Sequence, residues 1–71
     1  MKLQYFSDTD TLYINLSDAK PVNTDAITDN LIVDFDAEEQ VIGITIEQAS
    51  KVTDLAAIEA IDLPKTVAPA S

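Results

Sequence analysis

The residues of this chain that could carry out chemistry are carboxylates, hydroxyls and a few lysines. The sequence has thirteen Asp and Glu and four Lys, and it contains no His, Cys or Arg. The ordinary general base, the thiolate nucleophile and the bidentate clamp for phosphate are therefore all missing. We predict a protein that is not an enzyme, with no catalytic residues and no cofactor.

Two pairs of carboxylates are close enough in sequence to be weighed as acid–base pairs. They are Asp8 with Asp10, and Asp34 with Asp36. Both pairs lie near expected turns, which Asp caps through its side-chain oxygen, so turn capping is the preferred interpretation.

The segment around the second pair also places oxygen ligands at alternate positions, which suits a hard cation such as calcium. It lacks the glycine and the twelve-residue spacing of the helix–loop–helix calcium site. A dedicated metal site is therefore not predicted, and weak binding of calcium or magnesium is left open.

The charge of the chain is strongly one-sided, at a formal net value of −9. No basic residue lies between Lys20 and Lys51. The predicted acidic partner surface lies in this tract and consists of Asp34, Asp36, Glu38, Glu39 and Glu47. Such a charge repels nucleic acid and anionic lipid and attracts a basic protein. The alternative is a solvated acidic surface that only maintains solubility.

The length of 71 residues allows one compact domain. We expect a single domain over residues 1–63 and a flexible C-terminal tail over residues 64–71. No secretory leader and no membrane-length apolar run is recognised, so a cytoplasmic protein without a membrane partner is expected.

Alternating apolar residues predict two β-hairpins. A first loop centred on Asp8 and Thr9 would pair Tyr5 with Leu12, and Leu3 with Ile14. A second loop centred on Glu38 and Glu39 would give the pairs Phe35–Ile42, Val33–Ile44 and Leu31–Ile46, with Gly43 opposite Asp34. Whether residues 22–28 form an additional strand is left open, since Pro21 excludes a central ladder position nearby.

After residue 50 the apolar period changes. Leu55, Ile58 and Ile61 recur at intervals of three among alanines, which predicts a helix of about three turns. Ser50 or Thr53 would cap its start and Pro64 would end it. The expected fold is α+β: a small antiparallel β-meander of about four strands, with this C-terminal helix packed on one face.

One helix covers one face of a sheet, here the face with Leu12, Ile14, Val33 and Ile44. The opposite face would then carry the predicted interface residues Phe6, Tyr13, Ile32, Val41 and Thr45. This face is too apolar for a purely solvated surface, so we predict a homo-oligomer, a dimer formed through this face or through a sheet edge.

The strand segments also resemble a known family, the domain of unknown function 2283 family. The resemblance rests on Tyr5, DTLYI at 10–14, LSD at 16–18, LIVDFD at 31–36, VIGITI at 41–46 and ASK at 49–51. The chain departs from the family pattern at Phe6 and Ser7, where Asp-Pro is common, and at Asn30 and Gln40, where Gly is common.

The resemblance implies a small prokaryotic-type cytoplasmic domain with an antiparallel sheet and no established catalytic residues. Some such domains look like the antitoxin member of a two-gene pair. The resulting hypothesis is a non-enzymatic interaction module that binds a basic partner. The alternative is a self-associating structural homo-oligomer with no other partner.

Overall fold

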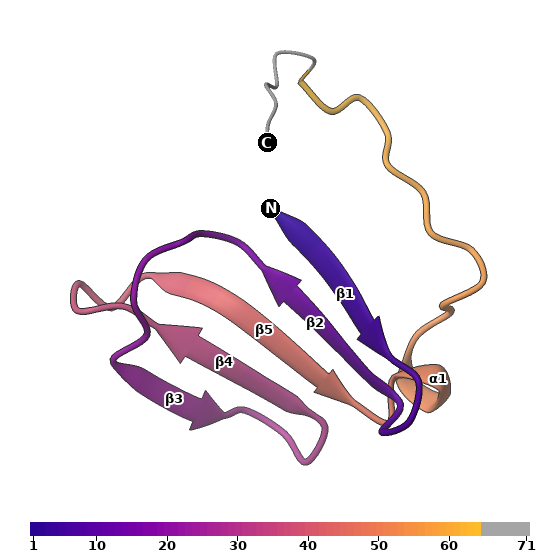
Figure 1. The fold of residues 1–71 in the computed structure, drawn as a ribbon, viewed down its shortest axis with the longest axis horizontal. Helices are drawn as coiled ribbons and strands as arrows, with labels where there is room; N and C mark the ends of the chain where they lie inside the picture. Colours follow the sequence, from indigo (N-terminus) through magenta and orange to yellow (C-terminus); the bar gives the residue numbers. More distant parts are fainter. Residues whose placement is uncertain (65–71) are drawn as a thin grey trace.

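The computed structural model describes residues 1–64 and contains one five-stranded sheet and one short helix (Figure 1). The elements are β1 (Lys2–Phe6), β2 (Thr11–Asn15), β3 (Asn23–Ala26), β4 (Leu31–Phe35), β5 (Val41–Glu47) and α1 (Ala49–Val52). The antiparallel sheet is confirmed, with five strands rather than four. The flexible tail predicted for residues 64–71 lies, from residue 65 on, outside the described residues.

The strands do not follow one another across the sheet as a simple meander would. Their order is β1-β2-β5-β4-β3, and every neighbouring pair is antiparallel. After the β1–β2 hairpin the chain crosses to the far edge and returns through β3 and β4, as Figure 1 shows, so that β5 enters the middle. The middle position suits β5 because its β-branched residues Ile42, Ile44 and Ile46 pack well between two partner strands.

The predicted registers of both hairpins are largely confirmed. Tyr5 pairs with Leu12, and Leu3 with Ile14. In the second hairpin the observed pairs include Leu31–Ile46, Val33–Ile44 and Asp34–Gly43. The predicted pair Phe35–Ile42 is wrong, because the register shifts after Asp34 and Phe35 faces Val41 instead. Such a shift places an extra residue on one strand, as in a β-bulge.

The additional strand, β3, answers the question left open for residues 22–28. Its sequence Asn-Thr-Asp-Ala has no apolar alternation, and three of its four residues, Asn, Asp and Ala, are of types depleted in strands. The segment forms a strand because it pairs with β4. The Val22 N–H donates to the Phe35 carbonyl at 2.8 Å, and the Ile27 N–H donates to the Leu31 carbonyl at 2.8 Å. These two bonds extend the pairing of β3 with β4 at both ends.

The two sides of the sheet differ in chemistry. Because side chains alternate along a strand, the registers assign each residue to a side. The side called here the apolar face carries Leu3, Tyr5, Leu12, Ile14, Leu31, Val33, Ile44 and Ile46. The side called here the polar face carries Lys2, Gln4, Tyr13, Asn15, Thr24, Ile32, Asp34 and Thr45.

The core of the described residues is small. Its buried apolar residues are Leu12, Val33, Ile42 and Ala49. Leu12 and Val33 confirm the predicted core positions, whereas Ile14 and Ile44 are only half-buried. Within residues 1–64 no large side chain is fully enclosed. Residues 1–64 therefore supply no complete second layer that packs on the sheet.

The predicted C-terminal helix is wrong in length and in position. The helix α1 has four residues and lies at one end of the sheet, beside the β1–β2 turn, rather than across a face (Figure 1). It ends at Thr53, whose backbone is extended and whose N–H and hydroxyl both donate to the Ala49 carbonyl, at 2.9 Å and 2.7 Å. Local bonds of this kind compete with helix continuation.

Residues 54–64, which follow α1, do not cover the sheet. Asp54 accepts a bond from the Ala56 N–H at 3.2 Å, a local turn in place of a helical bond. Ile58 and Ile61 of the predicted stripe are 65% and 70% exposed. Figure 1 shows this part of the chain leading away from the strands. The apolar face is therefore not hidden beneath a helix.

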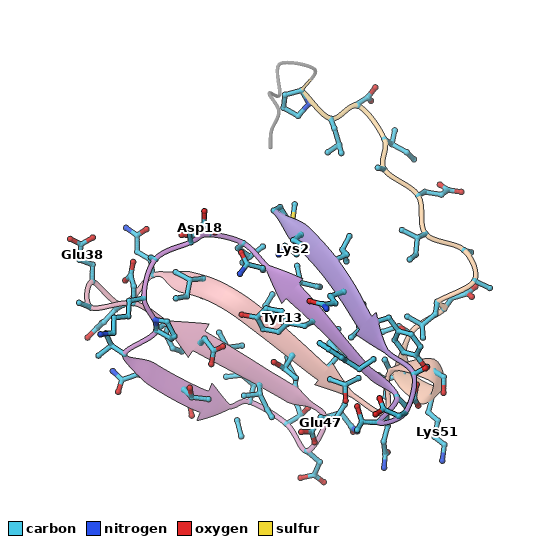
Figure 2. All side chains as sticks on the ribbon, in the orientation of Figure 1. Lys2, Tyr13, Asp18, Glu38, Glu47 and Lys51 are labelled. Carbon is cyan, nitrogen blue, oxygen red and sulfur yellow. The ribbon has the colours of Figure 1, made fainter. Side chains whose placement is uncertain are left out.

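The lone glycine, Gly43, makes room for an aromatic ring on the polar face. A Cβ at this position would lie 2.5 Å from the Tyr13 hydroxyl oxygen and 3.3 Å from a carboxylate oxygen of Asp34. Figure 2 shows Tyr13 in the middle of the sheet. The close approach explains why glycine occupies the middle of a strand, where it is otherwise unfavourable.

We predict that Gly43→Ala lowers the free energy of unfolding by about 1–3 kcal/mol, because the new methyl group overpacks the site against Tyr13. Urea unfolding followed by circular dichroism measures this change. The double variant with Tyr13→Phe removes the nearest atom and should recover part of the loss. Equal losses with and without the Tyr13 hydroxyl would contradict the assigned contact.

Candidate functional site

The β4–β5 turn presents carboxylates at one end of the sheet. The Asp36 carboxylate accepts bonds from the N–H groups of Glu38 at 2.8 Å and Gln40 at 2.9 Å. The Glu39 N–H donates to the Asp36 carbonyl at 3.0 Å, and Glu39 takes the left-handed conformation with φ of 63°. Asp36 therefore caps the turn, as preferred from the sequence, and its bonds hold the exposed Glu38 and Glu39 at the tip.

A shallow pocket lies beside this turn, where β3 and β4 pair. It has a volume of about 350 Å³ and is lined by Asn23, Thr24, Asp25, Phe35 and Glu39. The lining combines two carboxylates with one aromatic ring. Groups of this kind bind a cationic side chain, the carboxylates by charge and hydrogen bonds and the ring by its electron-rich face.

The predicted acidic partner surface is only partly brought together. Asp34 accepts a bond from the Thr24 hydroxyl at 2.8 Å and belongs, with the turn, to one end of the sheet. Glu47 lies at the other end, four residues along β5 from the partner of Asp34, or about 13 Å. Figure 2 shows Glu38 and Glu47 at these opposite ends.

Sequence reasoning missed Asn23, Asp25 and Phe35 as residues that share a pocket with Glu39. The pocket exists because β3 pairs with β4 and places Asn23 opposite Phe35. The sequence around β3 has no strand pattern, so no signal in it pointed to this juxtaposition. The absence of basic residues between Lys20 and Lys51 indicated only that Asp25 lies in an acidic tract, not that it lies beside Phe35 and Glu39.

The residues of the predicted dimer interface are similarly divided. Tyr13, Thr45 and Ile32 are cross-strand neighbours in one row of the polar face. Phe6 lies at the α1 end of the edge strand β1, and Val41 lies at the opposite end of β5. The interface on this face stays a prediction, but its premise, a helix covering the other face, is wrong.

Asp10 joins the β1–β2 turn to α1. Its carboxylate accepts bonds from the Tyr5 hydroxyl at 2.7 Å, the Ser50 hydroxyl at 2.7 Å and the Ser50 N–H at 3.1 Å. Its carbonyl accepts the Ala49 N–H at 2.8 Å. Asp10 itself has a φ of 56°, a conformation that Asp tolerates. Tyr5, Asp10 and Ser50 thus form a structural cluster, called here the clamp, that joins the β1–β2 turn to α1. Asp8 lies in the exposed turn.

This network changes the acidity of both groups. The hydroxyl of Ser50, followed by that of Tyr5, lowers the pKa of Asp10 because both donate to the charged carboxylate. The bond to Asp10, followed by partial burial, raises the pKa of Tyr5, which must stay protonated to donate. Neither shift produces a group poised near neutral pH for acid–base work.

No metal centre is found in the part of the chain that the structure describes, because no three acidic side chains there come close enough to hold an ion. Over residues 1–64, no helix is long and apolar enough to cross a membrane.

The Asp10 network predicts a loss of stability at both extremes of pH. Because the folded pKa of Asp10 is lowered, its contribution is present above about pH 3.8 and is lost as the pH falls through the folded value. Because the folded pKa of Tyr5 is raised, its contribution is present below pH 10.0 and is lost as the pH rises through the folded value. Urea midpoints measured across pH test both limits.

Variants separate this network from the other titrating groups. Asp10→Asn should show a smaller acid-induced drop than the wild type, and Tyr5→Phe a smaller drop at high pH. Asp8→Asn, in the same turn, serves as the matched control and should keep the wild-type profile. A wild-type acid profile in the Asp10 variant would contradict the assignment.

Comparison with known protein families places most of this chain in a family. A family model described as "Protein of unknown function (DUF2283)" matches residues 2–50, which include all five strands and the start of α1. No curated protein and no solved structure matches significantly. The matched range takes in Tyr5, Asp10 and Ser50, the three side chains of the clamp. The chain therefore belongs to the DUF2283 family of proteins of unknown function.

Proposed function

We propose that this chain is a non-enzymatic protein-interaction module that binds a basic partner, as the antitoxin of a two-gene pair would. The observation that carries the proposal is the pocket between β3 and the β4–β5 turn. Its lining combines the carboxylates of Asp25 and Glu39 with the ring of Phe35. A lysine or arginine side chain of the partner fits this chemistry.

The surroundings of the pocket support a cationic ligand. Glu38 stands at the tip of the same turn, and the tract between Lys20 and Lys51 has no basic residue to neutralise these carboxylates. Asp36 fixes the backbone of the turn before binding, so less order has to be imposed when a partner docks. The net charge of −9 favours encounter with a basic protein over long range.

The proposal predicts capture of a basic protein that depends on these particular carboxylates. The tagged full-length chain is expressed in its native host and recovered at about 50, 150 and 500 mM salt. A basic partner should be retained at the two lower concentrations and lost at the highest, since screening weakens attraction between opposite charges. The variant Asp25→Asn with Glu39→Gln should lose most of the capture.

The matched control is Asp8→Asn with Asp29→Asn. These two exposed carboxylates lie in the β1–β2 and β3–β4 turns, away from the pocket, and the control removes the same amount of charge. It should retain the partner. Recovery of the chain alone at physiological salt, or equal capture by both variants, would refute the proposal.

The alternative function is a self-associating structural protein with no partner beyond its own copies. The observation that favours it is the incomplete burial of the apolar face. Self-association and binding of a basic partner respond to salt in opposite directions, so both can be tested on the same chain.

A further inference from the structure

Within residues 1–64, the apolar face of the sheet has no second layer packed on it. Leu3 and Tyr5 on β1 are 53% and 44% exposed, and Ile14 and Ile44 in the middle of the face are half-buried. Stable domains bury such a face against another layer, because a single sheet cannot remove its own apolar side from water. The short helix α1 lies at one end of the sheet, and the segment after it leads away (Figure 1).

The charges of the chain are arranged so that a second copy can approach this face. The eight residues that define the apolar face lie on β1, β2, β4 and β5, and none of them is a carboxylate or an amine. On the same side of the sheet, at its margin, the edge strand β3 carries Asp25, which is paired with Val33 and is exposed. The carboxylates of the turns lie at the ends of the sheet, where water and salt screen the repulsion between two acidic chains. A highly basic partner would gain no ion pair from the centre of this face.

The size of the face also suits a partner of the same kind. The four strands that carry the eight residues, about 4.8 Å apart and with about five residues each at 3.3 Å, give about 320 Å² of flat area. Two such faces bury about 640 Å² of flat area. The relief of the side chains adds to this area and raises the total toward the roughly 1,200 Å² at which specific interfaces begin. An identical sheet matches the face in length and width, which a short helix does not.

We propose that the second layer is supplied by another copy of this chain, and that two apolar faces pack together as a two-fold symmetric β-sandwich. Sheets packed in this way lie about 10 Å apart, with strands within about 30° of each other. A symmetric arrangement makes each copy both donor and acceptor of the same surface. The inference does not depend on the proposed basic partner, since it concerns the purified chain alone.

Sedimentation equilibrium of the full chain from about 1 to about 500 µM tests the proposal. The wild type should be a dimer whose dissociation constant stays constant or decreases when salt is raised from about 50 to about 500 mM, because like charges are screened. Leu3→Glu places a charge on the central row of the face and should weaken the dimer at least about tenfold. Circular dichroism of the Leu3→Glu variant should show that its strand content is unchanged.

Gln4→Glu is the matched control, because it adds the same charge to the same strand on the polar face. It should leave the dissociation constant unchanged. Should Leu3→Glu fail to fold, Leu3→Thr removes apolar area while keeping a residue suited to strands, and it should also weaken the dimer.

Three results would overturn the proposal. One is a monomeric wild type over the whole concentration range. Another is a dimer that Ile32→Glu on the polar face dissociates and that the Leu3 variants leave intact. The third is a monomer in which nuclear Overhauser contacts join Ile58 or Ile61 to Ile14 and Ile44, because the C-terminal segment would then be the second layer.

Discussion

The architecture of this chain depends on one constraint: a sheet one layer thick carries nearly all of its large aliphatic side chains on one side. The alternation of residues in β1, β2, β4 and β5, combined with their registers, places these side chains together. The same constraint limits the core, whose buried apolar side chains within the described residues are those of Leu12, Val33, Ile42 and Ala49. A chain of this size buries only a small apolar area when it folds. The uncovered apolar face is therefore a large fraction of the apolar area whose burial could stabilise the fold.

Carboxylates serve two different purposes in this fold, and their hydrogen bonds separate the two. Asp10 and Asp36 accept backbone N–H groups and fix a helix start and a turn. Asp25 and Glu39 line a pocket, and Glu38 stands free at the tip of a turn. The first set explains why pairs of aspartates spaced like catalytic pairs need no catalytic role. The second set forms the acidic site at which we propose that a basic partner binds.

The family match places the sheet, rather than the segment after it, at the centre of what defines this protein. Residues 2–50 contain every strand and stop within α1. The clamp formed by Tyr5, Asp10 and Ser50 closes this unit by joining its first hairpin to its last residues. Both the apolar face and the pocket lie inside the matched range, so the surfaces that we interpret belong to the family unit itself.

The sequence by itself determined the two hairpins, because a one-residue slip would have set apolar side chains against polar ones. It also determined the chemistry that is absent, since His, Cys and Arg do not occur. The helical spacing of Leu55, Ile58 and Ile61 was misleading, because local bonds to Thr53 and Asp54 stop the helix after four residues. The spacing of apolar residues does not show whether such local hydrogen bonds will replace the helical ones.

Only the tertiary structure decided the rest. The strand β3 forms because β4 offers it an open edge, since Asn, Asp and Ala have little preference for a strand of their own. The entry of β5 between β2 and β4, and the bulge beside Phe35, likewise depend on pairing between segments far apart in the chain. The pocket that joins Asp25 to Glu39 follows from this pairing, and a linear sequence holds no local signal for a contact that two distant backbones create.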